Sequence, residues 1–257
     1  MTRVIAIANQ KGGVGKTTTA INLSSALAHF KRRVLLIDMD PQGNAGRGLG
    51  VDITLLSKTV YEALLGTEAI QSTVIHTGVE GVDLLPANLR LAQLEASMYQ
   101  QPVDRPFELL TKTVAPIKDN YDYIVIDCPP SLGLLSINAL ACANSVLIPV
   151  QCEYFAMEAL AAILSSISNI QNQLNPNLKI EGFLLTMYDA RTALGTEIAS
   201  EVRKLFKENT FLVSIPRNQS VSESQAKQMP VTSFRPTSQG SIAYFGLARE
   251  VIDHEER

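Results

Sequence analysis

The chain lacks the features that mark membrane, secreted and metal-cluster proteins. None of its apolar runs approaches the roughly 20 residues needed to cross a bilayer. Its three cysteines, Cys128, Cys142 and Cys152, are an odd number and do not have metal-site spacing. We interpret them as small buried residues of a protein in a reducing cytoplasm. Met1 leads directly into an apolar strand, so we expect no signal peptide.

An excess of charge of one sign is also missing. The chain has 22 Lys and Arg against 25 Asp and Glu, a net charge of −3, so composition alone does not indicate a nucleic-acid partner. It contains no internal repeat, low-complexity tract or flexible linker. A chain of 257 residues is long enough to bury a substantial core. We therefore expect one domain spanning residues 1–257.

What the chain does contain is a glycine-rich loop between a strand and a helix. The apolar run Val4–Ala8 predicts a strand buried on both faces. Residues 9–18 follow, with the sequence NQKGGVGKTT, and apolar residues then recur at helical spacing from Thr17 to Phe30. Strand, loop and helix together are the setting of a phosphate-binding P-loop. The alternative is a glycine-rich turn that ends by chance in Gly-Lys-Thr.

The residue types of this loop suit the parts of a nucleotide. Glycines let backbone N–H groups turn toward phosphate oxygens, and the helix N-terminus adds partial positive charge. Lys16 would contact the β- and γ-phosphates, and Thr17 would hold Mg²⁺ through its hydroxyl. Gln10 stands where the usual Walker A spacing has glycine, so the loop is a deviant Walker A. The predicted nucleotide-binding residues of the loop are Lys11, Gly12, Gly13, Val14, Gly15, Lys16, Thr17 and Thr18.

Acidic residues follow the next buried run, Val34–Ile37. Asp38 ends this predicted strand, where its carboxylate can reach the water shell of a metal ion or the loop itself. Asp40 faces the same side and reaches farther toward the γ-phosphate. Alternatively, both carboxylates cap the turn at Pro41.

A further aspartate closes the run Tyr123–Ile126. Asp127 has the position of a Walker B acid, which contacts Mg²⁺ directly or through water. An aspartate before two prolines could instead form a turn. The predicted metal site is Thr17, Asp38 and Asp127.

Buried strand candidates alternate with helical stretches along the chain. This order predicts an α/β fold with a doubly wound, mostly parallel sheet flanked by helices. The predicted strands are Val4–Ala8, Val34–Asp38, Val82–Pro86, Tyr123–Asp127, Ser145–Val150, Ile180–Thr186 and Phe211–Ile215. The predicted helices are Thr17–Phe30, Leu89–Met98, Pro106–Ile117, Ser136–Ala141, Met157–Leu174 and Leu194–Glu208. Met229–Ser241, rich in Pro and Ser, is predicted to be a surface loop.

These segments together resemble the ParA/MinD family of deviant-Walker ATPases, most closely its Soj-type chromosome-partitioning ParA branch. The resembling segments are 9–18, 34–44, 121–131, 149–154 and 185–192, and the similarity extends from about Arg3 to Val251. The resemblance implies ATP and Mg²⁺ as cofactors, with Asp40 orienting or activating the attacking water. It also implies that Lys11 reaches across an ATP-sandwich homodimer to the partner's phosphates. A solvated lysine at the loop edge is the alternative for Lys11. The implied catalytic residues are Lys11, Lys16 and Asp40.

The resemblance also implies positions for the base and for DNA. Pro216 and Asn218 would lie near the adenine, although a plain turn there is an equal alternative. Between Arg191 and Arg249 the chain has eight basic residues against four glutamates: Arg191, Arg203, Lys204, Lys207, Arg217, Lys227, Arg235 and Arg249. The family implies ATP-dependent, nonspecific binding of double-stranded DNA in this region, here by Arg191, Arg217, Lys227 and Arg235. Relatives generally carry an arginine where this chain has Ser220. Each basic residue could also be an ordinary solvated side chain.

The implied partner is a centromere-binding protein of the ParB/Spo0J type, which stimulates hydrolysis and releases the dimer from DNA during chromosome or plasmid segregation. The implied location is the cytoplasm, on the nucleoid when ATP is bound.

A ParA-like ATPase that positions a protein cargo is an alternative. A MinD-like membrane-associated ATPase needs a basic amphipathic C-terminal helix, whereas residues 248–257 are acidic. An iron–sulfur relative needs a cysteine where Pro130 stands. A binding module without turnover would not need Lys11, Lys16, Thr17, Asp40 and Asp127 together.

Overall fold

The computed structural model describes residues 2–100, 104–153 and 156–255 and has one seven-stranded sheet. The strands are β1 Arg3–Ile7, β2 Val34–Asp38, β3 Ile75–His76, β4 Val82–Leu85, β5 Tyr123–Asp127, β6 Ser145–Gln151 and β7 Lys179–Thr186. Their order is β3-β4-β2-β5-β1-β6-β7. Only the short β3, which the sequence pattern did not predict, runs antiparallel to its neighbour. The predicted doubly wound, mostly parallel sheet is confirmed.

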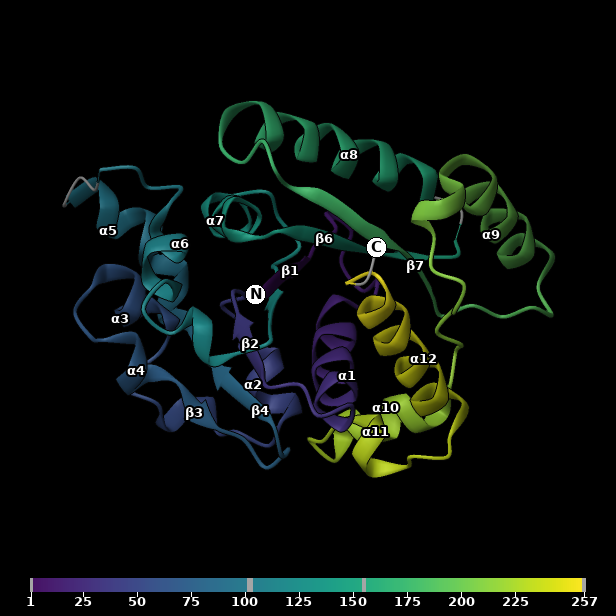
Figure 1. Cartoon of the computed structure of the whole chain (residues 1–257), viewed down its shortest axis with the longest axis horizontal. Helices are drawn as coiled ribbons and strands as arrows, with labels where there is room; N and C mark the ends of the chain where they lie inside the picture. The colour runs from purple at the N-terminus through teal and green to yellow at the C-terminus, as the bar shows by residue number, and fades with distance from the viewer. Residues whose placement is uncertain (1, 101–103, 154–155, 256–257) are drawn as a thin grey trace.

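Helices cover both faces of this sheet (Figure 1). Their bounds are α1 Lys16–His29, α2 Asn44–Gly48, α3 Val60–Leu65, α4 Ile70–Thr73, α5 Leu94–Gln100, α6 Leu109–Val114, α7 Leu134–Cys142, α8 Ala156–Gln173, α9 Ala193–Phe206, α10 Gln219–Ala226, α11 Val231–Phe234 and α12 Gln239–Asp253. Short 3₁₀ turns span Ile53–Leu55, Leu89–Gln93, Lys118–Asn120 and Lys207–Asn209. None of the helices in the described ranges is long and apolar enough to span a membrane.

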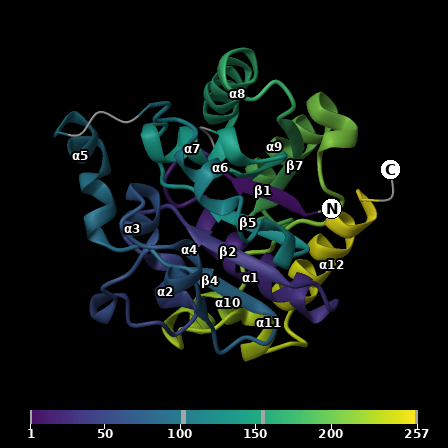
Figure 2. The same cartoon turned by 60° about the vertical axis from the view of Figure 1, so that its left-hand side comes forward.

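The two faces of the sheet build two separate apolar cores. Along β1, Val4 and Ala6 pack with one set of helices, whereas Ile5 and Ile7 pack with the other. This division follows from the two-residue period of a strand, which points successive side chains to opposite faces. The first core includes α3, α6, α7, α8 and α9, and the second includes α1, α11 and α12. Figure 2 shows these two sets of helices on opposite sides of the sheet.

The predicted strand Phe211–Ile215 does not form. The segment runs beside β7, and the Phe211 amide donates to the Phe183 carbonyl oxygen. The next two amides, of Leu212 and Val213, instead donate to the Glu250 carboxylate of α12, each at 2.8 Å. The Glu250 carboxylate therefore takes the Val213 amide, which is the next donor that a ladder with β7 would have used.

The predicted loop Met229–Ser241 is also wrong, because it contains α11 and the start of α12. Ser238 caps α12 by accepting a hydrogen bond from the Ser241 amide at 3.2 Å. The apolar residues Tyr244, Leu247 and Val251 then recur on one side of the helix and pack into the core against α1. The proline and serine content of residues 229–241 concealed the Ser238 cap and the start of this helix.

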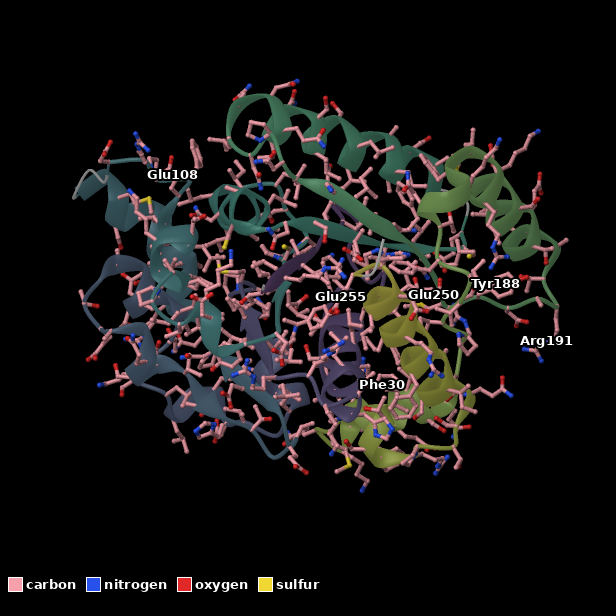
Figure 3. The ribbon with its side chains drawn as sticks, viewed as in Figure 1. Phe30, Glu108, Tyr188, Arg191, Glu250 and Glu255 are labelled. Carbon is pink, nitrogen blue, oxygen red and sulfur yellow. The ribbon has the colours of Figure 1, made fainter. Side chains whose placement is uncertain are left out.

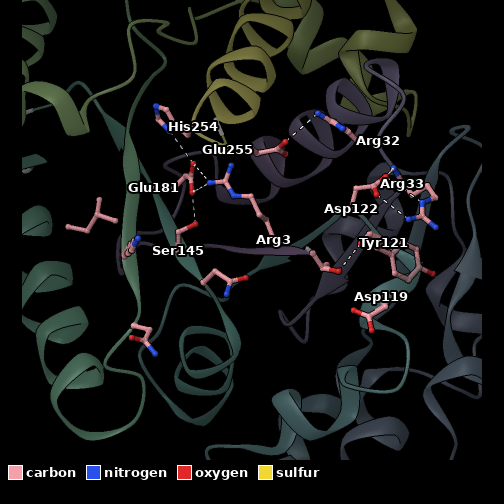
Figure 4. Close-up of a pocket in the computed structure, with 15 residues that line it drawn as sticks. Arg3, Arg32, Arg33, Asp119, Tyr121, Asp122, Ser145, Glu181, His254 and Glu255 are labelled. Carbon is pink, nitrogen blue, oxygen red and sulfur yellow. Dashed lines mark hydrogen bonds and ion pairs between the residues drawn. The ribbon is translucent and has the colours of Figure 1, made fainter. Parts of the chain in front are cut away.

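A cavity of about 1020 Å³ lies at the amino ends of the central strands. Figure 4 shows that several of its charged side chains are joined by hydrogen bonds and ion pairs. Arg3 donates to both carboxylate oxygens of the buried Glu181, at 2.8 and 2.7 Å, and His254 contacts the same carboxylate at 3.2 Å. Arg33 pairs with Asp122 in the same region. We interpret these pairs as a structural network that joins β1, β7 and the end of α12.

Candidate active site

The candidate site lies at the opposite edge of the sheet, where the carboxyl ends of β1, β2, β5, β6 and β7 meet. Strands on the two sides of β1 are reached by crossovers in opposite directions, and ligands of doubly wound sheets bind at such a switch point. In the register of the sheet, Asp127 is paired both with Ile7, the last residue of β1, and with Asp38. The glycine loop and the two acidic residues are therefore brought to one place.

The glycine loop has the backbone geometry of a phosphate cradle. Gly13 and Gly15 have φ angles of 76° and 90°, in the left-handed region that disfavours a side chain. Lys16, which begins α1, is 7% exposed, and its Nζ donates to the Lys11 carbonyl oxygen at 3.0 Å. Burial lowers the pKa of Lys16, and the nearby charge of Asp127 opposes that shift. The ammonium group is thus held over the loop, ready to meet negative charge.

Two polar side chains clamp the loop, and the sequence motifs did not mark either as a site residue. Asn9 donates to the Pro149 carbonyl oxygen at 2.7 Å and accepts a hydrogen bond from the Lys11 amide at 3.0 Å. Thr186, at the end of β7, donates to the Val14 carbonyl oxygen at 2.9 Å. The sequence feature that could have indicated Asn9 and Thr186 is the position of a polar residue at or just after the carboxyl end of a buried strand.

The two buried aspartates differ in how their oxygens are used. Asp38 accepts hydrogen bonds from the amides of Asp40 and Ala45, each at 3.0 Å. Neither oxygen of Asp127 accepts a hydrogen bond of good geometry within the described ranges, although the Thr17 hydroxyl is near enough to lower its pKa. Burial raises the pKa of both groups; the charge of Asp40 raises both further, and the charge of Asp38 also raises the pKa of Asp127.

These groups fit a magnesium ion. Mg²⁺ keeps several waters and uses one or two carboxylates together with phosphate oxygens. Asp127 offers a buried carboxylate without a protein donor of good geometry, beside the Thr17 hydroxyl. Asp38 lies on the adjacent strand but is already engaged by backbone amides, which suits an indirect role. The described residues contain no cluster of three His, Cys, Asp or Glu side chains that could hold a metal ion.

Asp40 and Lys11 lie at the rim of the site. The Asp40 carboxylate accepts a hydrogen bond from the Gln42 amide at 2.9 Å, which is the turn contact considered as an alternative role. The Lys11 ammonium lies 3.4 Å from a carboxylate oxygen of Glu153, just beyond β6. Its side chain is 28% exposed, so it points along the surface and not into its own loop.

The predicted adenine segment lies beside the same edge. The amides of Ile215 and Arg217 donate to the carbonyl oxygens of Leu185 and Tyr188 at 2.8 and 3.2 Å, which fixes the segment against the end of β7. Asn218 caps α10 by accepting a hydrogen bond from the Ser220 amide at 3.0 Å. The Asn218 carboxamide oxygen is therefore used in the cap, and Pro216 is bridged to Tyr188 just beyond the end of β7.

The four predicted DNA-contact residues are all exposed. Arg191 is 89% exposed at the periphery of the molecule (Figure 3) and pairs with Asp189 at 2.7 Å. Arg217 lies 3.9 Å from Glu153, and Lys227 is exposed at the end of α10. The Arg235 guanidinium donates to the Ser220 hydroxyl at 3.1 Å.

Fold and loop together define a P-loop nucleoside triphosphatase with a deviant Walker A motif. A family model described as an AAA domain matches residues 2–180. The sporulation initiation inhibitor protein Soj of Bacillus subtilis is 46% identical over 98% of both chains. The chromosome partitioning protein ParA of Myxococcus xanthus is 47% identical over 98% of this chain and 89% of its own. A solved structure titled cobyrinic acid a,c-diamide synthase from Mycobacterium smegmatis, with an ATP analogue and magnesium, has 37% identity and a TM-score of 0.87, covering 100% of this chain and 96% of that one.

The chain belongs to the ParA/MinD family of P-loop ATPases, on the branch of Soj and ParA.

Proposed function

We propose that this protein is a DNA-partitioning ATPase that binds ATP and Mg²⁺, forms a nucleotide-sandwich homodimer and binds double-stranded DNA without sequence preference. The proposal rests mainly on one observation, which is that two lysines of the same loop have different surroundings. Lys16 is buried over the loop, whereas the partly exposed Lys11 side chain contacts Glu153, which lies outside the loop. A second lysine in that position is better placed to contact a phosphate bound to another subunit than a phosphate bound in its own loop.

The groups around the loop account for nucleotide binding. Backbone amides of residues 12–18 and the N-terminus of α1 face the phosphates, with Lys16 supplying a full positive charge. Thr17 and Asp127 hold Mg²⁺, and Asp38 orients the turn that carries Asp40. The ion, when bound, neutralises charge that develops on the phosphates.

Hydrolysis requires an oriented water and additional positive charge. Asp40 lies at the rim of the loop, where its carboxylate orients the attacking water. Lys11 of the partner subunit supplies transition-state charge in the way an arginine finger does. For this to happen, Lys11 exchanges its contact with Glu153 for the partner's phosphates.

DNA binding is assigned to the basic residues Arg191, Arg217, Lys227 and Arg235. Relatives generally carry an arginine at the position of Ser220, and in this chain the Arg235 guanidinium lies against the Ser220 hydroxyl at 3.1 Å. A positive charge is therefore present at that place, although it comes from a different residue. Dimerisation doubles the number of such residues on one particle, which strengthens binding to a continuous duplex.

The remaining parts of the proposal come from the family. A ParB/Spo0J-type protein stimulates hydrolysis and releases the dimer from DNA, which drives segregation of a chromosome or plasmid. The protein acts in the cytoplasm as one domain of residues 1–257 and is on the nucleoid when ATP is bound. We place partition ahead of the synthase activity named for the structural neighbour because the Soj and ParA relatives are 46% and 47% identical, against 37% for that neighbour.

The proposal is tested with the Asp40→Ala variant and random-sequence duplex DNA. We expect binding with ATP, little with ADP or without nucleotide, and a further loss in the double variant that also carries Arg235→Glu. If two copies contribute about eight phosphate contacts, affinity should fall on the order of 10,000-fold between roughly 50 and 200 mM salt. A variant that dimerises with ATP but never binds DNA would remove DNA from the proposal and favour a protein cargo.

A further inference from the structure

One surface hydrogen bond joins the nucleotide site to the segment that carries basic residues. Thr18 lies in the first turn of α1, directly after the phosphate loop, and its hydroxyl oxygen accepts a hydrogen bond from Gln225 Nε2 at 2.6 Å. Gln225 lies in the last turn of α10, two residues before Lys227. The contact spans 207 residues of sequence. No residue in the sequence pattern indicated this link.

A threonine hydroxyl can serve both partners at once. It has one proton to donate and two lone pairs to accept, and Gln225 uses one lone pair. The Thr18 proton therefore stays available for a phosphate oxygen at the N-terminus of α1. Donation to an anion makes the hydroxyl oxygen a better acceptor, because hydrogen bonds in a chain polarise one another. Phosphate binding should then strengthen the contact with Gln225 and not compete with it.

The helices on the two sides of this contact are held differently. Two buried hydrogen bonds fix α11 to α1: Asn22 accepts from the Val231 amide at 2.7 Å, and Thr232 bonds Ser25 at 2.8 Å. Among the described side-chain hydrogen bonds, only the exposed bond of Gln225 joins α10 to α1. α10 packs on α11 and α12, but toward α1 it is held less firmly than α11, so the Gln225 bond is the contact through which nucleotide can act on it.

The position of α10 decides where the basic side chains lie. Arg235 contacts two residues of α10, the Ser220 hydroxyl at 3.1 Å and a Glu223 carboxylate oxygen at 3.4 Å. Lys227 follows the last residue of α10 directly. A continuous series of contacts thus runs from Thr18 through Gln225 and α10 to Arg235.

We propose that Gln225 is a positioning residue that couples nucleotide occupancy at Thr18 to the DNA-binding surface formed by Lys227 and Arg235. The DNA half of this inference rests on the proposed function, whereas the nucleotide half does not. Because coupling between two binding sites is reciprocal, DNA must tighten nucleotide binding by the same factor by which nucleotide tightens DNA binding.

The first experiment measures amide hydrogen exchange in α10 of the full-length protein with and without ADP and Mg²⁺. Gln225→Met is the test variant, since methionine keeps the length and helix propensity of glutamine but cannot donate. Ser222→Ala is the control, on an exposed position of the same helix. We expect ADP to slow exchange in α10 of the parent and the control, and to have little effect in Gln225→Met. Equal protection in all three proteins would overturn the inference.

The second experiment measures DNA affinity with a non-hydrolysable ATP analogue. Loss of one hydrogen bond predicts that nucleotide enhances DNA affinity about fivefold less in Gln225→Met than in the parent. Full enhancement in Gln225→Met would refute the coupling while leaving the DNA-binding function intact. A parent protein that binds no DNA would instead refute that function, and hydrogen exchange would still decide whether α10 responds to nucleotide.

Discussion

At the scale of single residues, the site is organised by side chains that hold the phosphate loop rather than by the residues that would touch a ligand. Thr186 and Asn9 each bond to main-chain atoms, and both come from the ends of buried strands. Thr186 holds the Val14 carbonyl oxygen, and Asn9 holds the Lys11 amide and ties it to Pro149, so the two side chains together fix the shape of the loop. The roles of Lys16 and Asp127 can be predicted from a sequence motif. The supporting contacts of Asn9 and Thr186 cannot, because they depend on which strands lie side by side.

Thr186→Val should weaken nucleotide binding without removing any predicted ligand. Valine keeps the shape of threonine but leaves the buried Val14 carbonyl oxygen without its 2.9 Å donor. Loss of such a bond costs about 1–2 kcal/mol, so ADP affinity should fall about fivefold to thirtyfold if the loop loses its shape. Titration calorimetry with ADP and Mg²⁺ measures this. Thr196→Val, at an exposed position of α9, is the control and should bind ADP normally.

At the scale of elements, the C-terminal helix is held in place from two sides. Its inner face packs against α1, and its end meets β1 and β7 through Glu181, which contacts Arg3 and His254. Burial alone would raise the pKa of Glu181, but the His254 contact, the charge of Arg3 and the Ser145 hydroxyl together lower it. The carboxylate is therefore ionised in the folded protein at a pH where the unfolded chain is already protonated.

This lowered pKa predicts the direction of an acid effect. The stabilisation by Glu181 should be complete above its unfolded pKa of 4.5 and be lost as pH falls through the lower folded value. Glu181→Gln should reduce the free energy of unfolding by about 3 kcal/mol near neutral pH, because it leaves Arg3 without a charged partner. Urea unfolding between pH 3 and 7 should show a smaller acid loss in Glu181→Gln than in the parent. Glu197→Gln, on an exposed face of α9, should match the parent at every pH.

At the scale of the whole molecule, the proposed reaction needs two copies of the chain. Each complete site would combine Asp40 of one subunit with Lys11 of the other, so the two residues would belong to different halves of one site. The Lys11 contact with Glu153 is intramolecular and partly exposed, with the two side chains 28% and 49% accessible. Such an ion pair is worth little in water, which makes its exchange for the partner's phosphates favourable.

Mixing two inactive variants tests this arrangement. Lys11→Ala and Asp40→Ala should each hydrolyse ATP at least about 100-fold more slowly than the parent. In a mixed dimer, one site lacks both residues and the other has both. An equal mixture should therefore recover about a quarter of the parent activity, because about half of the dimers are mixed and each has one intact site. Absence of recovery in a mixture that dimerises would show that Lys11 does not act across subunits. Lys112→Ala, at an exposed position of α6, is a control that should retain full activity.

The sequence by itself determined the sheet, the phosphate loop and the acids beside it. Strands buried on both faces and a strand–loop–helix order are local patterns, and parallel strands must bring their carboxyl ends to one edge. The course of Phe211–Ile215 could not be predicted from local patterns, because Glu250 of α12 bonds two amides of this segment, which is distant in sequence. Only the tertiary structure decided that Arg235 lies against Ser220 and that Gln225 reaches Thr18. These are side-chain contacts between separate elements, and they depend on how helices pack rather than on any periodicity within them.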